Sequence, residues 1–263
     1  GIDCRTILGS KRPDAKAGVA HYTYHLVDHL LELDDKNEYY LFFDKQVQDV
    51  SYFERPNSTI KYFPFSAYKK FLPLTYSHLL MAAFLGRQWL DVYHSPAYTI
   101  PLAYTKSAVV TVHDLAIYHK PEWFPKGQMF SVKIVVPSSL KKAKCIIATS
   151  QYTKKDIIKV FKISAHKIKV IYEGVDKRVE KNLKVREKYH IKKKFILFIG
   201  TLEPRKNIPG LIRAFHKLKK TNIYKNYQLV IAGAKGWSYK EIFDTVKKLK
   251  MKDKVIFCGY VPQ

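Results

Sequence analysis

Apolar and polar positions follow two different periods along the chain. Between residues 19 and 33 the apolar positions recur at steps of three and four, at Val19, Tyr22, Leu26, Leu30 and Leu33. This spacing predicts a helix with one apolar face. Short runs rich in β-branched and aromatic residues predict strands, at Tyr39–Phe43, Thr59–Phe63, Asp91–His94, Ala108–Val112, Cys145–Thr149 and Lys167–Ile171. Further helices are predicted at Tyr76–Trp89 and Tyr152–Phe161, the second capped by Ser150. The alternation predicts a doubly wound α/β fold with a parallel sheet.

The same alternation starts again after a charged, aperiodic segment. Strands are predicted at Phe195–Gly200, Gln228–Ala232 and Val255–Gly259, with helices at Ile208–Lys220 and Tyr239–Lys250. We therefore predict a Rossmann-like N-terminal domain over residues 1–176, a linker over 177–194 and a C-terminal domain over 195–263. Three strands make half of a Rossmann domain, so this second domain is expected to be incomplete. A ligand is expected in a cleft outside the carboxyl ends of the strands.

Composition excludes several classes of protein. Apolar residues make up 47% of the chain, which is enough for proper cores. The cysteines Cys4, Cys145 and Cys258 lie far apart, so neither a zinc site nor a disulfide framework is predicted, and a reducing cytoplasm fits best. The longest apolar stretch is interrupted by proline, histidine and arginine, which argues against a membrane-spanning helix.

The strong positive charge has three competing explanations. The net charge is +25, and lysines scattered along predicted helices supply most of it. Such lysines are usually solvated surface, and this explanation is preferred. The second explanation is peripheral contact with an anionic membrane, on the inner face of the membrane for a cytoplasmic protein. Nucleic acid is not expected as a partner, because no face with clustered arginines and interleaved aromatics is evident.

The strongest local motif is the string from Gly200 to Asn207. It follows a predicted buried strand, contains Arg205 and Lys206, and leads into a helix. Backbone N–H groups and the dipole at a helix N-terminus favour an anion, and the two cations would neutralise it. The structural alternative is that both cations are ordinary surface charges. The length of the string favours a phosphate site.

Two histidines lie at the carboxyl ends of predicted strands. His113 and Asp114 come directly after Ala108–Val112, at the carboxyl end where the cleft is expected. A histidine held structurally by the neighbouring Asp114 is the alternative, but the position favours a functional role. His94 ends another strand, and a role in the pocket and a role in wall packing are equally supported.

The motifs in their order resemble the retaining family-four glycosyltransferases, which have the GT-B architecture of two Rossmann-like domains. The resemblance is strongest to mannosyltransferases that build cell-surface polysaccharides. It extends over nearly the whole chain, through the strings Asp91–Pro96, Val112–Leu115, Pro121–Trp123, Ile147–Ser150, Tyr172–Asp176, Gly200–Asn207, Ile231–Gly233 and Phe257–Val261. No single string decides the matter, but their order and spacing together do.

The resemblance implies roles for individual residues. Arg205 and Lys206 would grip the donor diphosphate, and Gly18 would approach it through its backbone. His113 would contact the transferred sugar or the acceptor near the reacting carbon, with Asp114 beside it as the second catalytic candidate. Thr201, Glu203 and His94 are candidates for an acceptor or sugar pocket. The resemblance implies no metal and no cofactor, because the nucleotide diphosphate sugar is the donor substrate.

Two departures from the family pattern qualify these roles. The family carries a Gly-Gly-Ile-Gly-Arg-Tyr-like string where this chain has Ala17 to Tyr22, so two glycines and an arginine are replaced. The Glu-x7-Glu segment that organises the donor sugar would lie beyond Gln263. The fragment is therefore expected to be inactive by itself.

The sequence thus predicts transfer of a hexosyl group, preferably mannosyl, from a nucleotide diphosphate sugar to a glycan or lipid-linked glycan. Two alternatives remain. A GT-B scaffold can also carry a sugar phosphorylase or a nucleotide-sugar epimerase. The altered Ala17–Tyr22 loop leaves room for a non-catalytic homologue that binds a nucleotide sugar, whereas the intact Glu203–Asn207 string opposes that alternative.

Overall fold

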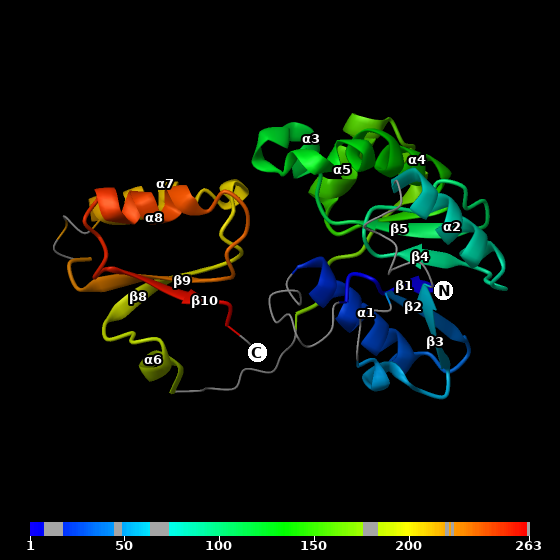
Figure 1. Ribbon diagram of the computed structural model, residues 1–263, viewed down its shortest axis with the longest axis horizontal. Coiled ribbons are helices and arrows are strands. Elements are labelled where there is room, and N and C mark those ends of the chain that lie inside the picture. Colours follow the sequence, from blue (N-terminus) through cyan, green and yellow to red (C-terminus); the bar gives the residue numbers. More distant parts are fainter. Residues whose placement is uncertain are drawn as a thin grey trace. The chain divides into compact units, whose positions relative to one another are not determined.

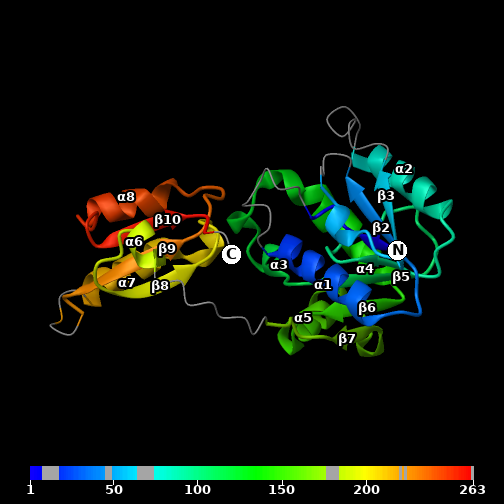
Figure 2. The same ribbon diagram turned by 90° about the horizontal axis from the view of Figure 1, so that it is seen from below.

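The chain forms two compact units. A computed structural model describes residues 1–7, 18–44, 49–63, 74–175, 184–218, 221 and 224–261 (Figures 1 and 2). The first unit comprises Gly1–His119 and Gly127–Gly174, and the second comprises Lys120–Lys126 and Val175–Gln263. In the second unit the Trp237 indole N–H donates to the Trp123 carbonyl oxygen at 2.6 Å. This bond ties the segment 120–126 to the rest of its unit.

The first unit contains one parallel sheet and its crossover helices. Its strands are β1 (Ile2–Asp3), β2 (Tyr39–Asp44), β3 (Ser58–Phe63), β4 (Tyr93–Ser95), β5 (Ala108–Val112), β6 (Cys145–Ala148) and β7 (Ile168–Val170). Its α-helices are α1 (Val19–Leu33), α2 (Leu74–Gly86), α3 (Ala116–His119), α4 (Val136–Lys142) and α5 (Gln151–Phe161). The elements predicted from the sequence are confirmed in type, and α1 and β5 also in both bounds. The short helices α3 and α4 were not predicted.

The strand order explains which helices cover which face. The sheet runs β3-β2-β1-β4-β5-β6-β7, with every pair parallel. Parallel crossovers are right-handed, so helices change face where the direction of strand addition reverses. Accordingly α1 lies on one face, and α2, α4 and α5 lie on the other (Figure 1). The reversal falls between β1 and β4, the position at which doubly wound sheets bind ligands.

Alternate residues of the central strands enter two apolar cores. Phe42 of β2 packs with Met81 and Leu85 of α2, whereas its neighbours Leu41 and Phe43 pack with the α1 side. This alternation is the period-two pattern of a strand that is buried on both faces. Helix α1 is amphipathic and buries Ala20, Thr23, Val27 and Leu31, which is why the three-and-four spacing predicted it from the sequence.

A buried polar cluster joins β1 to β4. The Asp3 carboxylate accepts hydrogen bonds from the Arg5 guanidinium at 2.5 Å and from the Tyr93 hydroxyl at 2.9 Å. Burial alone would raise the pKa of Asp3, but the charge and hydrogen bonds of Arg5, with the bond from Tyr93, outweigh it and hold that pKa below its usual value. The cluster therefore fixes the point where the strand order reverses.

The predicted helix cap at Ser150 is confirmed. Its hydroxyl accepts a hydrogen bond from the backbone N–H of Thr153 at 3.0 Å, at the start of α5. This bond satisfies one of the N–H groups that a helix leaves unpaired. The predicted linker over residues 177–194 holds a short helix, α6 (Lys184–Lys188), which charge alone did not reveal.

The second unit has a smaller sheet with two helices on one of its faces. Strands β8 (Lys194–Ile199), β9 (Tyr227–Ala232) and β10 (Val255–Gly259) pair in the order β10-β9-β8, all parallel. Helices α7 (Ile208–Leu218) and α8 (Lys240–Lys248) lie together on one side of it (Figure 1). Their side chains enclose a core that contains Ile212, Phe215, Leu229, Ile231 and Ile242. On the opposite face Phe195, Leu197 and Ile199 of β8 are exposed, whereas Val230 of β9 is buried.

The three cysteines are free thiols in the structure. Among the described residues, no helix combines the length and the apolar character needed to cross a membrane.

Candidate functional site

His113 is held at the carboxyl end of β5 by contacts with its backbone. Its carbonyl oxygen accepts hydrogen bonds from the hydroxyl groups of Thr149 at 3.0 Å and Thr153 at 3.1 Å. Both threonines lie at or beside the start of α5. The loop after β5 is therefore fixed by the next crossover, and the imidazole projects from a rigid position.

The His113 ring contacts two oxygen acceptors from distant parts of the sequence. Its Nε2 lies 2.9 Å from the Pro96 carbonyl oxygen, and its Nδ1 lies 3.1 Å from a carboxylate oxygen of Glu173. A neutral imidazole can donate to only one of these acceptors, and the protonated ring can donate to both. The His113 side chain is 12% exposed and that of Glu173 is 53% exposed. Each ring nitrogen of His113 thus has an oxygen acceptor beside it, at the carboxyl end of β5.

Two tyrosine rings complete the surroundings of His113. Tyr22 of α1 meets the imidazole edge to face, with ring centroids 4.8 Å apart, and Tyr98 does so at 5.8 Å. The cluster thus combines α1, the loops after β4 and β5, and the segment after β7. These elements surround the carboxyl ends of β4 and β5, next to the reversal of strand order.

Asp114 is placed differently from its neighbour. Its side chain is exposed, and Oδ1 accepts a hydrogen bond from the Ala116 N–H at 3.0 Å, at the start of α3. Its own backbone N–H donates to the Tyr98 hydroxyl at 3.2 Å. The His113 ring contacts the Pro96 carbonyl oxygen and the Glu173 carboxylate. A structural role of this histidine would therefore involve Glu173, which the sequence did not predict.

His94 lies inside the sheet wall. Its Nε2 is 2.9 Å from the Thr111 hydroxyl of β5. Burial lowers the pKa of His94 to about 4, so the imidazole is neutral near pH 7. A neutral, bonded histidine in this position supports the wall and presents little to a ligand.

Gly18 immediately precedes α1 and has a φ of 60°. This left-handed backbone conformation favours glycine. An added Cβ would meet no heavy atom of the described residues within 4 Å. Of the Ala17–Tyr22 string, Ala17 lies outside the described residues.

In the second unit the Gly200–Asn207 string forms the predicted strand-to-helix loop. It passes from β8 through a 3₁₀ turn, Pro204–Lys206, to α7. A Cβ built on Gly233, after β9, would lie 1.9 Å from the Gly200 carbonyl oxygen. Only glycine permits this close approach, which presses the two strand-end loops together. Thr201 is half-buried within the same loop.

The two cations of this loop have different environments. A carboxylate oxygen of Glu203 lies 2.9 Å from both Nε and a terminal nitrogen of Arg205, and the Glu203 side chain is only 5% exposed. Lys206 is exposed, and its Cε lies near Gly200, 3.8 Å from the position of a built Cβ. Lys206 therefore lies back over the end of β8 with its charge open to solvent, whereas Glu203 neutralises and orients Arg205.

The start of α7 adds to this positive region. Its first turn contains no acidic residue, so its N–H groups and dipole favour an anion. The loop can accordingly bind a phosphate group by one exposed ammonium, one oriented guanidinium and backbone donors. These are the components that the sequence predicted.

Sequence reasoning gave no functional role to Glu173, Tyr22 or Tyr98. Glu173 lies in the Tyr172–Asp176 string, one of the motifs that carry the family resemblance, but the string has no predicted chemical role. The tyrosines carry no chemical signal of their own. Their proximity to His113 depends on the strand order, which local patterns do not contain.

Comparison with known proteins identifies the family. Residues 17–179 match the profile described as "Glycosyltransferase Family 4", and residues 179–263 match "Glycosyl transferases group 1". The chain belongs to glycosyltransferase family 4. The two matches meet at residue 179, close to the predicted end of the first domain.

Named relatives of this family-4 chain include mannosyltransferases. It is 30% identical over 192 residues to the O-antigen chain mannosyltransferase B of Escherichia coli, a match that covers 70% of this chain and 50% of that protein. It is 30% identical over 160 residues to the O-antigen chain mannosyltransferase RfbU of Salmonella typhimurium, covering 61% of this chain and 41% of the relative. The matches thus span about half the length of these relatives.

Solved structures confirm the GT-B fold. Anabaena HepE, crystallised in complex with UDP and glucose, matches with a TM-score of 0.68 at 16% identity, covering 99% of this chain and 68% of HepE. WaaG, a glycosyltransferase involved in lipopolysaccharide biosynthesis, matches with a TM-score of 0.64 at 12% identity, covering 99% of this chain and 70% of WaaG. At such identities the likeness concerns the fold alone.

Proposed function

We propose that the protein to which this chain belongs is a retaining hexosyltransferase. It moves a mannosyl group from a nucleotide diphosphate sugar to a glycan or a lipid-linked glycan. The observation that carries this proposal is the Gly200–Asn207 loop, with its exposed Lys206 before the start of α7, in a chain that belongs to glycosyltransferase family 4. The mannosyl group is favoured because two relatives at 30% identity are named mannosyltransferases.

In the proposed reaction the second unit binds the leaving group. As the bond between the sugar and the diphosphate breaks, negative charge grows on the diphosphate oxygens. Fixed positive groups then stabilise the transition state more than the ground state. Lys206 supplies the exposed charge, Arg205 a guanidinium oriented by Glu203, and Thr201 a hydroxyl for the donor. The proposal assigns this charge stabilisation to the protein and requires no cofactor.

The first unit would act on the transferred sugar and the acceptor. His113 has a fixed backbone, and its Nδ1 faces the exposed carboxylate of Glu173. A substrate oxygen that replaced this carboxylate would accept from Nδ1 near the reacting carbon. Asp114 is exposed beside it. Gly18 would let the start of α1 approach the diphosphate, and His94 would support the pocket wall.

We place this reaction in the cytoplasm and keep peripheral contact with an anionic membrane as the alternative to a basic surface that is only solvated. The support is the net charge of +25, because anionic leaflets attract basic proteins. Co-sedimentation with vesicles of zwitterionic lipid alone or with added anionic lipid tests this point. Equal binding to both vesicle types would remove it.

The function is tested by comparing the 263-residue chain with a polypeptide that carries its reading frame to the length of the relatives. A panel of UDP-linked and GDP-linked hexoses would be offered with alcohol acceptors or with phosphate. We expect glycoside formation with retained anomeric configuration from the longer polypeptide, and little or none from the 263 residues.

The other candidate functions give different products in the same assay. Sugar phosphate formed from phosphate would indicate a phosphorylase, and an isomerised donor would indicate an epimerase. Donor binding without any turnover by the longer polypeptide would indicate a non-catalytic homologue. Inverted products would leave the transferase but remove the retaining mechanism.

A further inference from the structure

One side of α1 carries a row of histidine and aspartate side chains, residue types that can bind metal ions, and the proposed transfer gives this row no role. His21, His25 and His29 follow one another at intervals of four residues, and Asp28 lies three residues after His25. Residues three and four apart are neighbours on a helix surface. Two histidines spaced in this way are also the arrangement by which helices hold zinc in known motifs.

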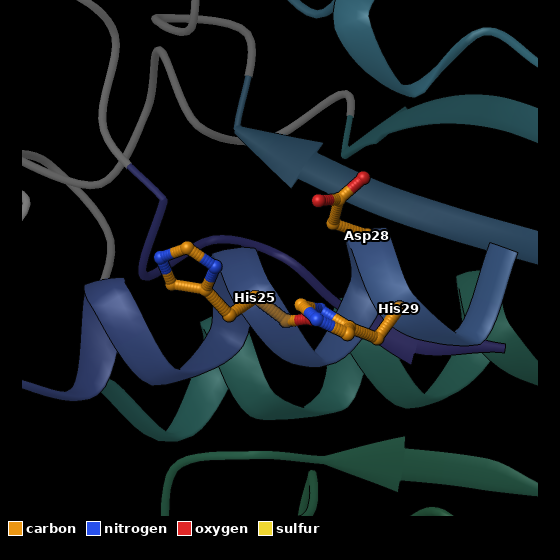
Figure 3. Close-up of side chains that lie close together, drawn as sticks. All are labelled: His25, Asp28 and His29. Atoms are coloured by element: carbon orange, nitrogen blue, oxygen red, sulfur yellow. The ribbon is translucent and has the colours of Figure 1, made fainter. Parts of the chain in front are cut away.

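The three groups His25, Asp28 and His29 lie within reach of one ion. Each offers one ligand atom, and these atoms all lie within 4.8 Å of one another (Figure 3). Zinc bonds of about 2.0–2.2 Å place tetrahedral ligand atoms roughly 3.3 Å apart. Side-chain rotations that move the ligand atoms by about an ångström would close that difference. His29 is exposed, and His25 and Asp28 are half-buried.

Hydrogen bonds orient both rings for binding. His29 Nδ1 lies 2.9 Å from the His25 carbonyl oxygen, so it donates there and the neutral ring keeps its lone pair on Nε2. His25 Nε2 lies 3.1 Å from His21 Nε2. When His25 donates in this contact, the lone pair stays on its Nδ1, the ring nitrogen on the Asp28 side in Figure 3. Such secondary bonds to metal-ligating histidines fix the ring and its tautomer.

Asp28 has capacity for an ion besides its present partners. One carboxylate oxygen accepts from Arg55 at 2.6 Å, and the other accepts from the Tyr52 hydroxyl at 3.3 Å. An ionised carboxylate offers about four lone-pair sites, so two bonds leave room for a metal. Arg55 holds the carboxylate in place, but its own positive charge opposes that of a cation.

We propose that His25, Asp28 and His29 form a binding site for a borderline transition-metal dication of the zinc type, with His21 positioning the His25 ring. Two imidazoles and one carboxylate suit zinc, cobalt or nickel, whereas magnesium and calcium prefer sites made only of oxygen. The site is separate from the proposed transfer reaction, and its test measures binding alone.

The test is titration of the 263-residue chain with zinc by calorimetry and with cobalt(II) by visible absorption. We expect one saturable site per chain, and a melting temperature that rises with zinc and falls back with chelator. His25→Ala and His29→Ala should each weaken binding by at least about tenfold. His166→Ala removes a histidine outside the cluster, bonded to Ser164, and should leave the affinity unchanged.

A second pair of variants separates a ligand from a structural ion pair. Asp28→Asn and Arg55→Gln both remove the ion pair between these side chains, but only Asp28→Asn removes the carboxylate ligand. We expect weaker zinc binding in Asp28→Asn and equal or tighter binding in Arg55→Gln, which removes an opposing charge. Absence of saturable binding, or an equal loss of affinity in His25→Ala and His166→Ala, would overturn the site. Equal weakening in Asp28→Asn and Arg55→Gln would remove Asp28 as a ligand and with it the three-residue site.

Discussion

His113 and Lys206 both follow a parallel strand, but their surroundings are drawn from very different spans of the sequence. Lys206 lies near Gly200 within one string, Gly200–Asn207, and the neighbouring loop at Gly233 approaches Gly200. The partners of His113 come from Tyr22, Pro96 and Glu173. A phosphate site made of one loop and one helix start can therefore be predicted from a local motif. A site whose residues are brought together by the strand order cannot.

The two sheets also differ in how fully they are covered. The first unit buries its sheet between α1 on one side and α2, α4 and α5 on the other, and residues such as Phe42 and Phe43 are fully buried. The second unit covers one face with α7 and α8, while Leu197 and Ile199 on the other face are 50% and 75% exposed. The same type of substitution should therefore lower the free energy of unfolding by different amounts in the two units, and at the two faces of the smaller sheet.

The largest effect is expected for Asp3→Asn in the first unit. Removing one partner of a buried ion pair leaves the other uncompensated, at a cost of about 3–5 kcal/mol. Urea denaturation of the chain would measure this loss in the free energy of unfolding. The exposed Asp35→Asn is the matched control, expected within about 0.5 kcal/mol of the parent.

The pH dependence of Asp3 has a definite sign. Its pKa is lowered in the folded state, so its contribution to stability is present above the unfolded value of about 3.9 and is lost as pH falls through the folded value. Asp3→Asn should therefore flatten the acid limb of the stability profile. An unchanged acid limb would contradict the ion pair.

The next largest effect is expected for Lys206→Ala in the second unit. Loss of a charge-assisted contact should weaken nucleoside diphosphate binding by roughly 1.5–3 kcal/mol, measured by calorimetry on the longer polypeptide. Lys217→Ala removes an exposed charge near the other end of α7 and should have little effect. Unchanged affinity in Lys206→Ala for both the diphosphate and the donor would reject the phosphate assignment.

His113→Ala tests the site that is dispersed in the sequence. If His113 stabilises the reacting centre, kcat and kcat/KM should fall together by at least about tenfold, while diphosphate affinity stays unchanged. Glu173→Gln keeps the shape of the ring's partner but removes its charge, and should lower kcat by a smaller factor. Near-normal kcat with a lowered melting temperature in His113→Ala would make the histidine structural.

The extent to which the sequence predicted this molecule follows the same division. Helix α1 and strand β5 were predicted to the residue because amphipathic spacing and β-branched runs are local signals. The GT-B architecture came from ordered motifs, and the Ser150 cap from one side chain before a helix. The pairing of His113 with Glu173, and of Arg205 with Glu203, was not predicted. Such contacts depend on strand order and loop geometry, which no short pattern encodes.

The smallest effect is expected for Leu197→Thr on the exposed side of β8. The Leu197 side chain is 50% exposed, and Thr is β-branched, a shape that suits a strand. The free energy of unfolding should therefore change by about 0.5 kcal/mol or less.

Leu229→Ala, in the next strand but facing α7 and α8, should cost about 2–5 kcal/mol because it leaves a cavity in the core. The same pair measured in the longer polypeptide sharpens the comparison. A cost of Leu197→Thr that rises toward that of Leu229→Ala would mean that further residues cover this face, and a cost that stays small would mean that the face remains open.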